Sequence, residues 1–355
     1  MNDCHMAILT GDDTGAGAGL TAWRNADAAS VSGELKPTDL VLGWYLKEPT
    51  YTTERIGSMS TARTRDRWSM GRREGIWQSR HAFQTCQFVW WLMQTAGTPT
   101  QEGVPAGYNT HTITISASNI PLWHGLHFER EGITSNELRY DMYGFLPSDL
   151  VINCGESAEN FKATQEITVP FSFLKSDASD IAAQTQRAPG TTGQIWKDWN
   201  HAIIGNGAGR DPDGLQYNGA NLEVDILDIS IKLHRDYYFG TPDTTGYPTV
   251  GVMLGWDYSV VLKVRPIGDL FYTVNRAEKS AYAGDLDYDF YFTADATNDK
   301  IRFLFDKMYM VPVDEVNDWN QWFEGYEITL EPLDTTSSLT VTGIDSLDNT
   351  HFENP

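Results

Sequence analysis

The sequence predicts a mainly β protein with one long α-helix and long loops. Strand-forming residues are abundant, with 12 Trp, 16 Tyr and 15 Phe beside many Thr, Val and Ile, while 31 Gly and 15 Pro can form turns. Several stretches alternate apolar and polar residues, which is the pattern of half-buried strands. At 355 residues the chain can bury a sizeable core, as one large β domain or two fused ones.

The chain begins with a predicted N-terminal arm, residues 1–33, which is rich in Gly, Ala, Asp and Ser. A first β half is predicted over residues 34–174. Its first strand covers 40–46, and residues 48–57 read as a strand and turn that lead outward.

The one long helical pattern covers residues 80–97, and Gly97 provides a C-terminal stop where a left-handed residue is tolerated. Five side chains share one face at helical spacing: Phe83, Cys86, Val89, Trp90 and Met93. Three more add apolar surface on the other side: Phe88, Trp91 and Leu92. A helix that is apolar nearly all round is expected to be covered nearly all round.

Alternating strands follow the helix. Residues 110–116 place His111, Ile113 and Ile115 on one face and hydroxyl side chains on the other. The remaining strands of this half are predicted over 120–132, 138–144, 145–153 and 165–173.

Residues 175–219 are polar and rich in loop-forming residues, and they predict a region that connects two β halves. The second half covers 220–344 and closes the fold, and 345–355 is a polar C-terminal tail. Its predicted strands are 222–233, 248–264, 285–292, 300–311, 326–332 and 338–343. The apolar phase of the first of them shifts at Leu227 and Asp228, which predicts a β-bulge.

The formal net charge is −22. It argues against nucleic acid as a bound ligand, because a phosphate-binding surface needs clustered Lys and Arg. It does not argue against DNA that passes without binding, because acidic walls repel phosphate. Acidity that serves only solubility is the alternative interpretation.

Residues 55–80 are the one strongly basic region of this acidic chain. Arginine forms bidentate ion pairs with carboxylates and is favoured in interfaces, so we interpret this region as a subunit interface. A solvated loop and a nucleic-acid contact are the alternatives. The predicted interface residues are Arg55, Arg63, Arg65, Arg67, Trp68, Arg72 and Arg73.

No catalytic residue, metal site or cofactor is predicted. Asp13-Thr-Gly15 has no second copy with which to share a proton, and Asp211-Pro-Asp-Gly214 is explained more simply by a turn. His111, His124 and His127 lie close in sequence without a metal-ligand motif. With no secretory signal and no apolar run of about 18 residues, we expect a soluble protein made in the cytoplasm.

The order of elements resembles the tail tube proteins, or major tail proteins, of long-tailed, siphovirus-like bacterial and archaeal viruses. The residues that carry the likeness are Ala96-Gly97, His111-Thr112, Ile120-Pro121, Tyr143-Gly144 and Thr168-Val-Pro-Phe-Ser172. The resemblance implies a β-sandwich or barrel-like tail tube fold with one flanking α-helix and long loops. It also implies hexameric rings that stack into a tube, and a long loop ahead of the helix that contacts neighbouring subunits.

Further expectations follow from this resemblance. The protein would be located in the virion tail after assembly in the host cytoplasm, with tail terminator, tape-measure and baseplate proteins as partners, and DNA would pass through the tube during ejection without specific binding. The predicted lumen residues are Glu129, Glu131, Asp285, Asp287 and Asp289. Residues 1–33 and 175–219 have no firm counterpart in these proteins.

Two other functions remain open from the sequence. The many aromatic residues could form stacking platforms in a carbohydrate-binding or carbohydrate-cleaving β-sandwich, with Asp285 and Asp287 as the acid and base. The chain could also be another capsid or neck component of a virus particle.

Overall fold

The protein was examined as a computed structural model. The structure describes residues 4–8, 36–37, 41–55, 68–85, 88–89, 91–92, 100–103, 107–115, 125–130, 138–143, 147–156, 158, 161–171, 173–175, 196–204, 215–217, 220–239, 251–276, 286–295, 299–311, 313 and 326–345. Most of them lie in strands, which confirms the predicted fold class, and every strand pair is antiparallel.

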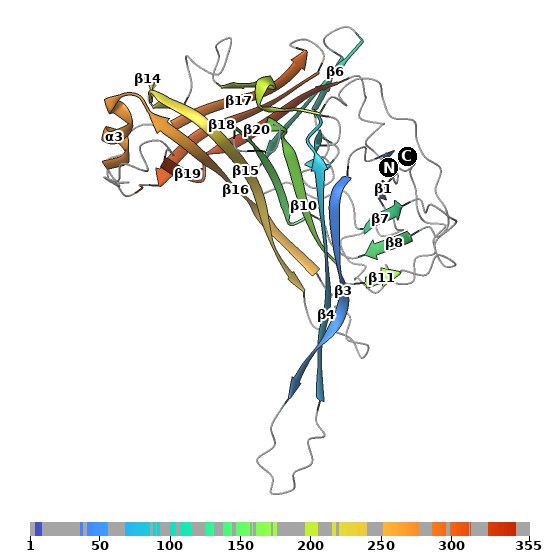
Figure 1. Ribbon diagram of the computed structural model, residues 1–355. Helices are drawn as coiled ribbons and strands as arrows, with labels where there is room; N and C mark the ends of the chain where they lie inside the picture. Colours follow the sequence, from blue (N-terminus) through green and yellow to red (C-terminus); the bar gives the residue numbers. More distant parts are fainter. Residues whose placement is uncertain are drawn as a thin grey trace, which may run out of the picture.

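The larger of two sheets folds over into two layers. Its first layer runs in the order β3 (Val41–Arg55), β4 (Trp68–Ala82), β10 (Thr164–Phe171), β9 (Asp149–Gly155), β15 (Val224–Phe239), β16 (Gly251–Pro266) and β19 (Tyr326–Pro332). Its second layer contains β17 (Leu286–Asp295), β18 (Asp299–Val311), β20 (Ser338–Asp345), β6 (Asn109–Ile115) and β5 (Thr100–Glu102). Strand β19 pairs with both β16 and β18 and so joins the layers (Figure 1).

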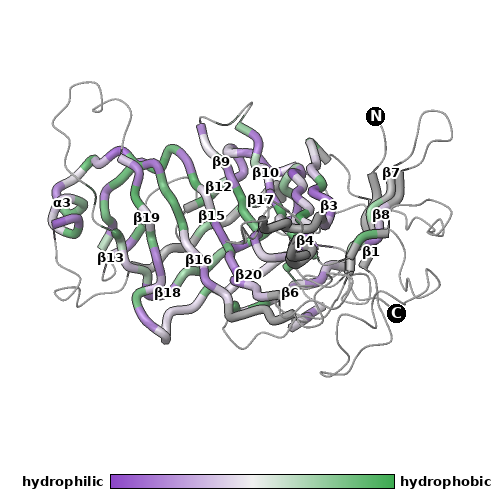
Figure 2. Tube along the Cα trace, turned by 90° about the horizontal axis from the view of Figure 1, so that it is seen from below, coloured by the Kyte–Doolittle hydropathy of each residue, from purple (hydrophilic) through white to green (hydrophobic). Residues whose placement is uncertain are grey.

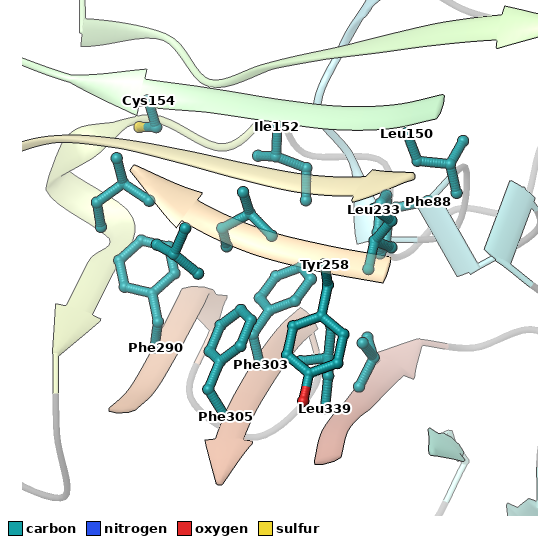
Figure 3. Packing of buried hydrophobic residues seen from close by; sticks show 14 of the residues in the cluster. Phe88, Leu150, Ile152, Cys154, Leu233, Tyr258, Phe290, Phe303, Phe305 and Leu339 are labelled. Atoms are coloured by element: carbon teal, nitrogen blue, oxygen red, sulfur yellow. The ribbon is translucent and has the colours of Figure 1, made fainter. Parts of the chain in front are cut away.

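The hydrophobic core lies between these two layers. Leu150, Ile152 and Leu233 of the first layer face Phe303 and Phe305 of the second, and all five side chains are buried (Figure 3). Hydrophobic and hydrophilic residues follow one another along β16, β18 and β19, so each strand turns one face to the core (Figure 2). This arrangement is that of a β-sandwich.

A helix packs on the second layer. Five described residues are helical, namely Thr85, Phe88, Val89, Trp91 and Leu92, and the last four are buried. The Phe88 N–H donates to the Gln84 carbonyl at 3.1 Å, and the Phe88 ring lies 5.5 Å from that of Phe303. The predicted start at Arg80 was wrong, because β4 continues to Ala82 and pairs there with Thr164 of β10. Helical spacing of apolar residues cannot show where a preceding strand ends.

Gly343 of β20 allows this helix to approach the sheet. A Cβ at this position would lie 2.5 Å from Val89 Cγ2 and 3.4 Å from Thr85 Cγ2. Because both neighbours are buried, we expect Gly343→Ala to lower the free energy of unfolding by about 1–3 kcal/mol through overpacking. Urea denaturation measures the loss.

Gly43 of β3 provides the matched control for this substitution. A Cβ at Gly43 meets nothing within 4 Å, so Gly43→Ala should leave stability unchanged or slightly increased. Equal effects of the two substitutions would contradict the close packing of the helix on β20.

The smaller sheet has the order β11 (Phe173–Lys175), β8 (Leu138–Tyr143), β7 (Gly125–Arg130), β1 (Cys4–Ile8) and β2 (Lys36–Pro37). It lies beside β3 and β4 (Figure 1), and aromatic rings form the contact between them. The Trp77 ring lies 4.6 Å from Phe128 and 5.4 Å from Trp44. The N-terminal residues were predicted as an arm, but Cys4–Ile8 forms a strand that pairs with β7. The Gly-rich composition of residues 1–33 hid this short strand.

The strands predicted for the second half are confirmed as β15 to β20, and the stretch predicted over 248–264 holds one long strand, β16, from Gly251 to Pro266. The register of β15 shifts between Ile226 and Asp228, so the predicted bulge is confirmed. The division into two halves stays a prediction. Strands from both are paired directly, because β15 pairs with β9 and β20 pairs with β6.

Some elements were not predicted. Helix α3 (Asp269–Arg276) buries Phe271 and Val274. Its Asn275 side chain donates to the Val313 carbonyl and accepts from the Val313 N–H, both at 2.9 Å. The region predicted as a connecting loop contains the 3-10 helix η3 (Trp199–His201) and the short strands β12 (Ala202–Ile204) and β13 (Gln216–Tyr217), while β14 (Ala220–Asn221) follows it. All three strands lie in the sheet edge at β17, where pairing rather than local sequence favours them.

Candidate assembly surfaces

A long β-hairpin projects from the sandwich. Strands β3 and β4 contain 15 residues each, and they extend beyond the other strands of the first layer (Figure 1). Backbone pairing continues along this projection, with Tyr51 opposite Arg73 and Arg55 opposite Trp68. We call the described projecting part, Tyr51–Arg55 with Trp68–Arg73, the hairpin arm. A strand pair of this length holds residues far from the core in a defined order.

The hairpin arm carries four of the predicted interface residues. Arg55 ends β3, Trp68 begins β4 directly opposite, and Arg72 and Arg73 follow within β4. Arg63, Arg65 and Arg67 lie outside the described residues. The region was predicted as a loop from Arg55 to Arg80, but from Trp68 onward it is a strand. Its Arg and Ser residues hid the strand, because both faces of a projecting hairpin can be polar.

Arg80 belongs to the sandwich rather than to the arm. It is the cross-strand partner of Glu166 in β10, and its Nε lies 3.6 Å from Glu166 Oε1. Both side chains are about half exposed, with relative exposures of 57% and 50%, so the pair contributes little to stability.

Strand β3 forms an edge of the larger sheet. Among the described residues it pairs with β4 alone, so its other side presents backbone N–H and C=O groups. Leu42 and Tyr45 on this strand are 46% and 55% exposed. A long edge strand with exposed apolar side chains is a surface for pairing with another chain.

The described lumen candidates lie in two different sheets of the fold. Glu129 lies in β7 of the smaller sheet, opposite Arg139. Asp287 and Asp289 lie in β17 of the larger sheet, opposite Gln216 and Leu304. Glu131 and Asp285 lie outside the described residues. A single acidic surface would therefore require neighbouring subunits to align the two sheets.

The structure separates the histidines that were weighed as a cluster. His111 in β6 is buried, with its Nε2 3.4 Å from Asp345 Oδ1, whereas His127 lies in the smaller sheet. His124, Asp13-Thr-Gly15 and Asp211-Pro-Asp-Gly214 lie outside the described residues. Across the part of the chain that the structure describes, no three His, Cys, Asp or Glu side chains group closely enough to hold a metal ion.

Within the same described part, no helix is long and apolar enough to cross a membrane.

Sequence reasoning missed a buried ion pair near the start of the helix. Lys197 is fully buried, and its Nζ contacts Asp299 Oδ2. Asp299 Oδ1 also accepts a hydrogen bond from the Thr85 hydroxyl at 2.9 Å. The Lys197 backbone bonds to Phe83 and Ala163, both at 2.9 Å. These contacts join four segments that are distant in sequence, at Phe83–Thr85, Ala163, Lys197 and Asp299, and no local pattern could have identified the pair.

His81 of β4 is another buried polar residue. Its Nε2 lies 2.7 Å from the Ser79 hydroxyl, and burial lowers its pKa from 6.5 to about 3. The folded state therefore holds His81 neutral, while the unfolded chain protonates it below pH 6.5. The stabilisation is complete above pH 6.5 and is lost as the pH falls toward 3.

We expect acid to destabilise the protein through His81. The contribution of His81 should lower the free energy of unfolding by about 1.4 kcal/mol for each pH unit below 6.5, which amounts to about 2 kcal/mol at pH 5. His81→Leu should remove that part of the pH dependence, as measured by urea denaturation at pH 7 and pH 5. His201→Leu, which removes a partly exposed histidine, is the control. An unchanged slope in His81→Leu would contradict the burial of a neutral imidazole.

Comparison with known proteins identifies no family for this chain. No family model matches the sequence, and no curated protein matches it.

Proposed function

We propose that the protein is a structural virion protein that assembles into stacked hexameric rings and forms a tail tube through which viral DNA passes. The observation that carries the proposal is the hairpin arm, which places Arg55, Arg72 and Arg73 away from the sandwich of a chain with net charge −22. An arm of this kind can reach carboxylates of a neighbouring copy, because bidentate arginine pairs favour interfaces.

The edge strand β3 supports the same proposal. Pairing with a neighbouring copy would satisfy the backbone groups of β3 and cover Leu42 and Tyr45. Continuous sheets between subunits would then form the wall of a tube. The acidity of the chain suits a lumen that does not retain DNA.

This proposal assigns partners and a location. The tube would bind tail terminator, tape-measure and baseplate proteins, and the protein would be located in the virion tail. The resemblance in element order supports these assignments together with the sandwich, the flanking helix and the projecting segment before it.

Negative-stain electron microscopy of the purified protein at increasing concentration tests the proposal. Rings or hollow tubes of uniform width are the expected result, and light scattering should give the mass of a ring as a multiple of 39.8 kDa. Because a tube can require an initiator, the sample is also examined after addition of preformed virus tail tips. Monomers under both conditions would reject the proposal.

A further inference from the structure

A cleft of about 750 Å³, lined by both polar and apolar side chains, lies on the outer face of the first layer. Its volume is in the range of small-ligand sites. Two cross-strand rows form its floor. The first contains Thr164, Asn153, Ser230 and Val261 on β10, β9, β15 and β16, and the second contains Gly155, Asp228, Lys263 and Glu327 on β9, β15, β16 and β19. The floor is therefore held by four or more paired strands, and is rigid.

An aromatic ring lines the cleft above this floor. The Trp196 N–H donates to the Ala163 carbonyl at 2.6 Å, and Lys162 Nζ lies 4.1 Å from the centre of the indole ring. Both Trp196 and Lys162 are half-buried and both line the cleft. The indole is thus fixed in orientation before any ligand binds, which reduces the entropy cost of binding.

Gly155 positions a carboxylate on the floor. A Cβ at this residue would lie 1.9 Å from Asp228 Oδ1, so only glycine leaves room for the Asp228 side chain. Asp228 is also the first residue of β15 to pair with β16 after the bulge. Bulges commonly re-aim side chains beside functional sites.

The charges of the cleft nearly balance. Its lining holds three cationic side chains, Arg80, Lys162 and Lys263, and two carboxylates, Asp228 and Glu327. Glu166, which lies outside the lining, pairs with Arg80. A site for phosphate or nucleic acid would carry a clear excess of positive charge. Hydroxyl, amide, carboxylate and ammonium groups beside an indole instead provide donors and acceptors for a neutral ligand with many hydroxyl groups.

We infer that this cleft binds a neutral carbohydrate. The apolar face of a sugar ring packs on the face of the Trp196 indole opposite Lys162, and its hydroxyl groups bond to the floor, with Asp228 and Glu327 as acceptors and Lys263 as a donor. This binding goes beyond the proposed tube. The site is built from residues of one subunit, so it can be tested on the unassembled protein.

Saturation-transfer NMR on the purified chain tests the inference. The probes are glucose, galactose, N-acetylglucosamine, maltose, cellobiose and lactose, each at millimolar concentration. At least one should receive saturation. Asp228→Asn and Glu327→Gln, which keep the side-chain shape, should each weaken binding of that sugar about tenfold through a lost charged hydrogen bond. Trp196→Ala should abolish it.

Two matched controls separate the cleft from the rest of the surface. Glu331→Gln changes an exposed carboxylate on the same strand, β19, and Tyr238→Ala removes an aromatic side chain that is exposed elsewhere on the sheet. Both variants should bind as the unaltered protein does. No transfer to any of the six sugars would overturn the inference. An equal loss of sugar binding in Trp196→Ala and Tyr238→Ala would also overturn it. So would binding of sulfate, dependent on Lys263, by a protein that binds none of the sugars.

Discussion

Charge reversal on the hairpin arm is expected to abolish assembly. In Arg72→Glu/Arg73→Glu, two guanidinium groups that would meet carboxylates of a neighbouring copy become two further negative charges. Like charges brought together in an interface cost several kcal/mol, and a ring repeats that cost at every subunit contact. The variant should remain monomeric at concentrations where the unaltered protein forms rings or tubes, as seen by electron microscopy and light scattering.

A matched variant controls for net charge. Arg265→Glu/Arg276→Glu makes the same change in charge on the sandwich, at the end of β16 and at the end of α3. It should assemble normally, because these positions lie away from the arm. The four-residue variant Arg65→Glu/Arg67→Glu/Arg72→Glu/Arg73→Glu extends the test to two predicted interface residues outside the described part of the chain. Normal tubes from that variant would reject the interface assignment. If neither two-residue variant assembles, the change in net charge rather than the arm is the cause.

The second large effect is expected at Lys197. Lys197→Met removes the partner of a buried carboxylate and leaves Asp299 with the Thr85 hydroxyl. Breaking a buried ion pair in this way should lower the free energy of unfolding by about 3–5 kcal/mol. Urea denaturation of the isolated protein measures it.

Two further variants show whether the loss comes from the unpaired charge. Lys232→Met removes the partly exposed partner of Asp149, whose Oδ1 lies 3.5 Å from the Lys232 Nζ, and should cost no more than about 1 kcal/mol. Lys197→Met/Asp299→Leu removes both buried charges and should recover much of the stability lost in the single variant. A loss of less than about 1 kcal/mol in Lys197→Met would contradict the burial of the pair.

Elements with strict periodicity could be predicted from the sequence. In β6 the alternation at His111, Ile113 and Ile115 is the burial pattern of the folded strand. In β15 the phase shift at Leu227 and Asp228 is the observed bulge. These features are local, because a strand that buries one face must show a period of two residues wherever it pairs.

Elements that depend on distant partners could not be predicted. The extension of β4 to Ala82 is favoured by pairing with β10, over 80 residues later, against the helical spacing of the same residues. The N-terminal strand Cys4–Ile8 depends on β7 in the same way. The arginines of the arm were found from composition, whereas their placement on a projecting hairpin follows from the long β3–β4 ladder.

The sequence by itself determined the fold class, most strands of the second half and the presence of one basic region in an acidic chain. These follow from composition and from local alternation of apolar and polar residues. Only the tertiary structure decided that the sheet folds into two layers, that Lys197 meets Asp299, and that Trp196 stands beside Asp228 in one cleft. The physical reason is that each of these contacts joins strands or loops that are far apart in the chain, and their free energy depends on burial and pairing that no single segment contains.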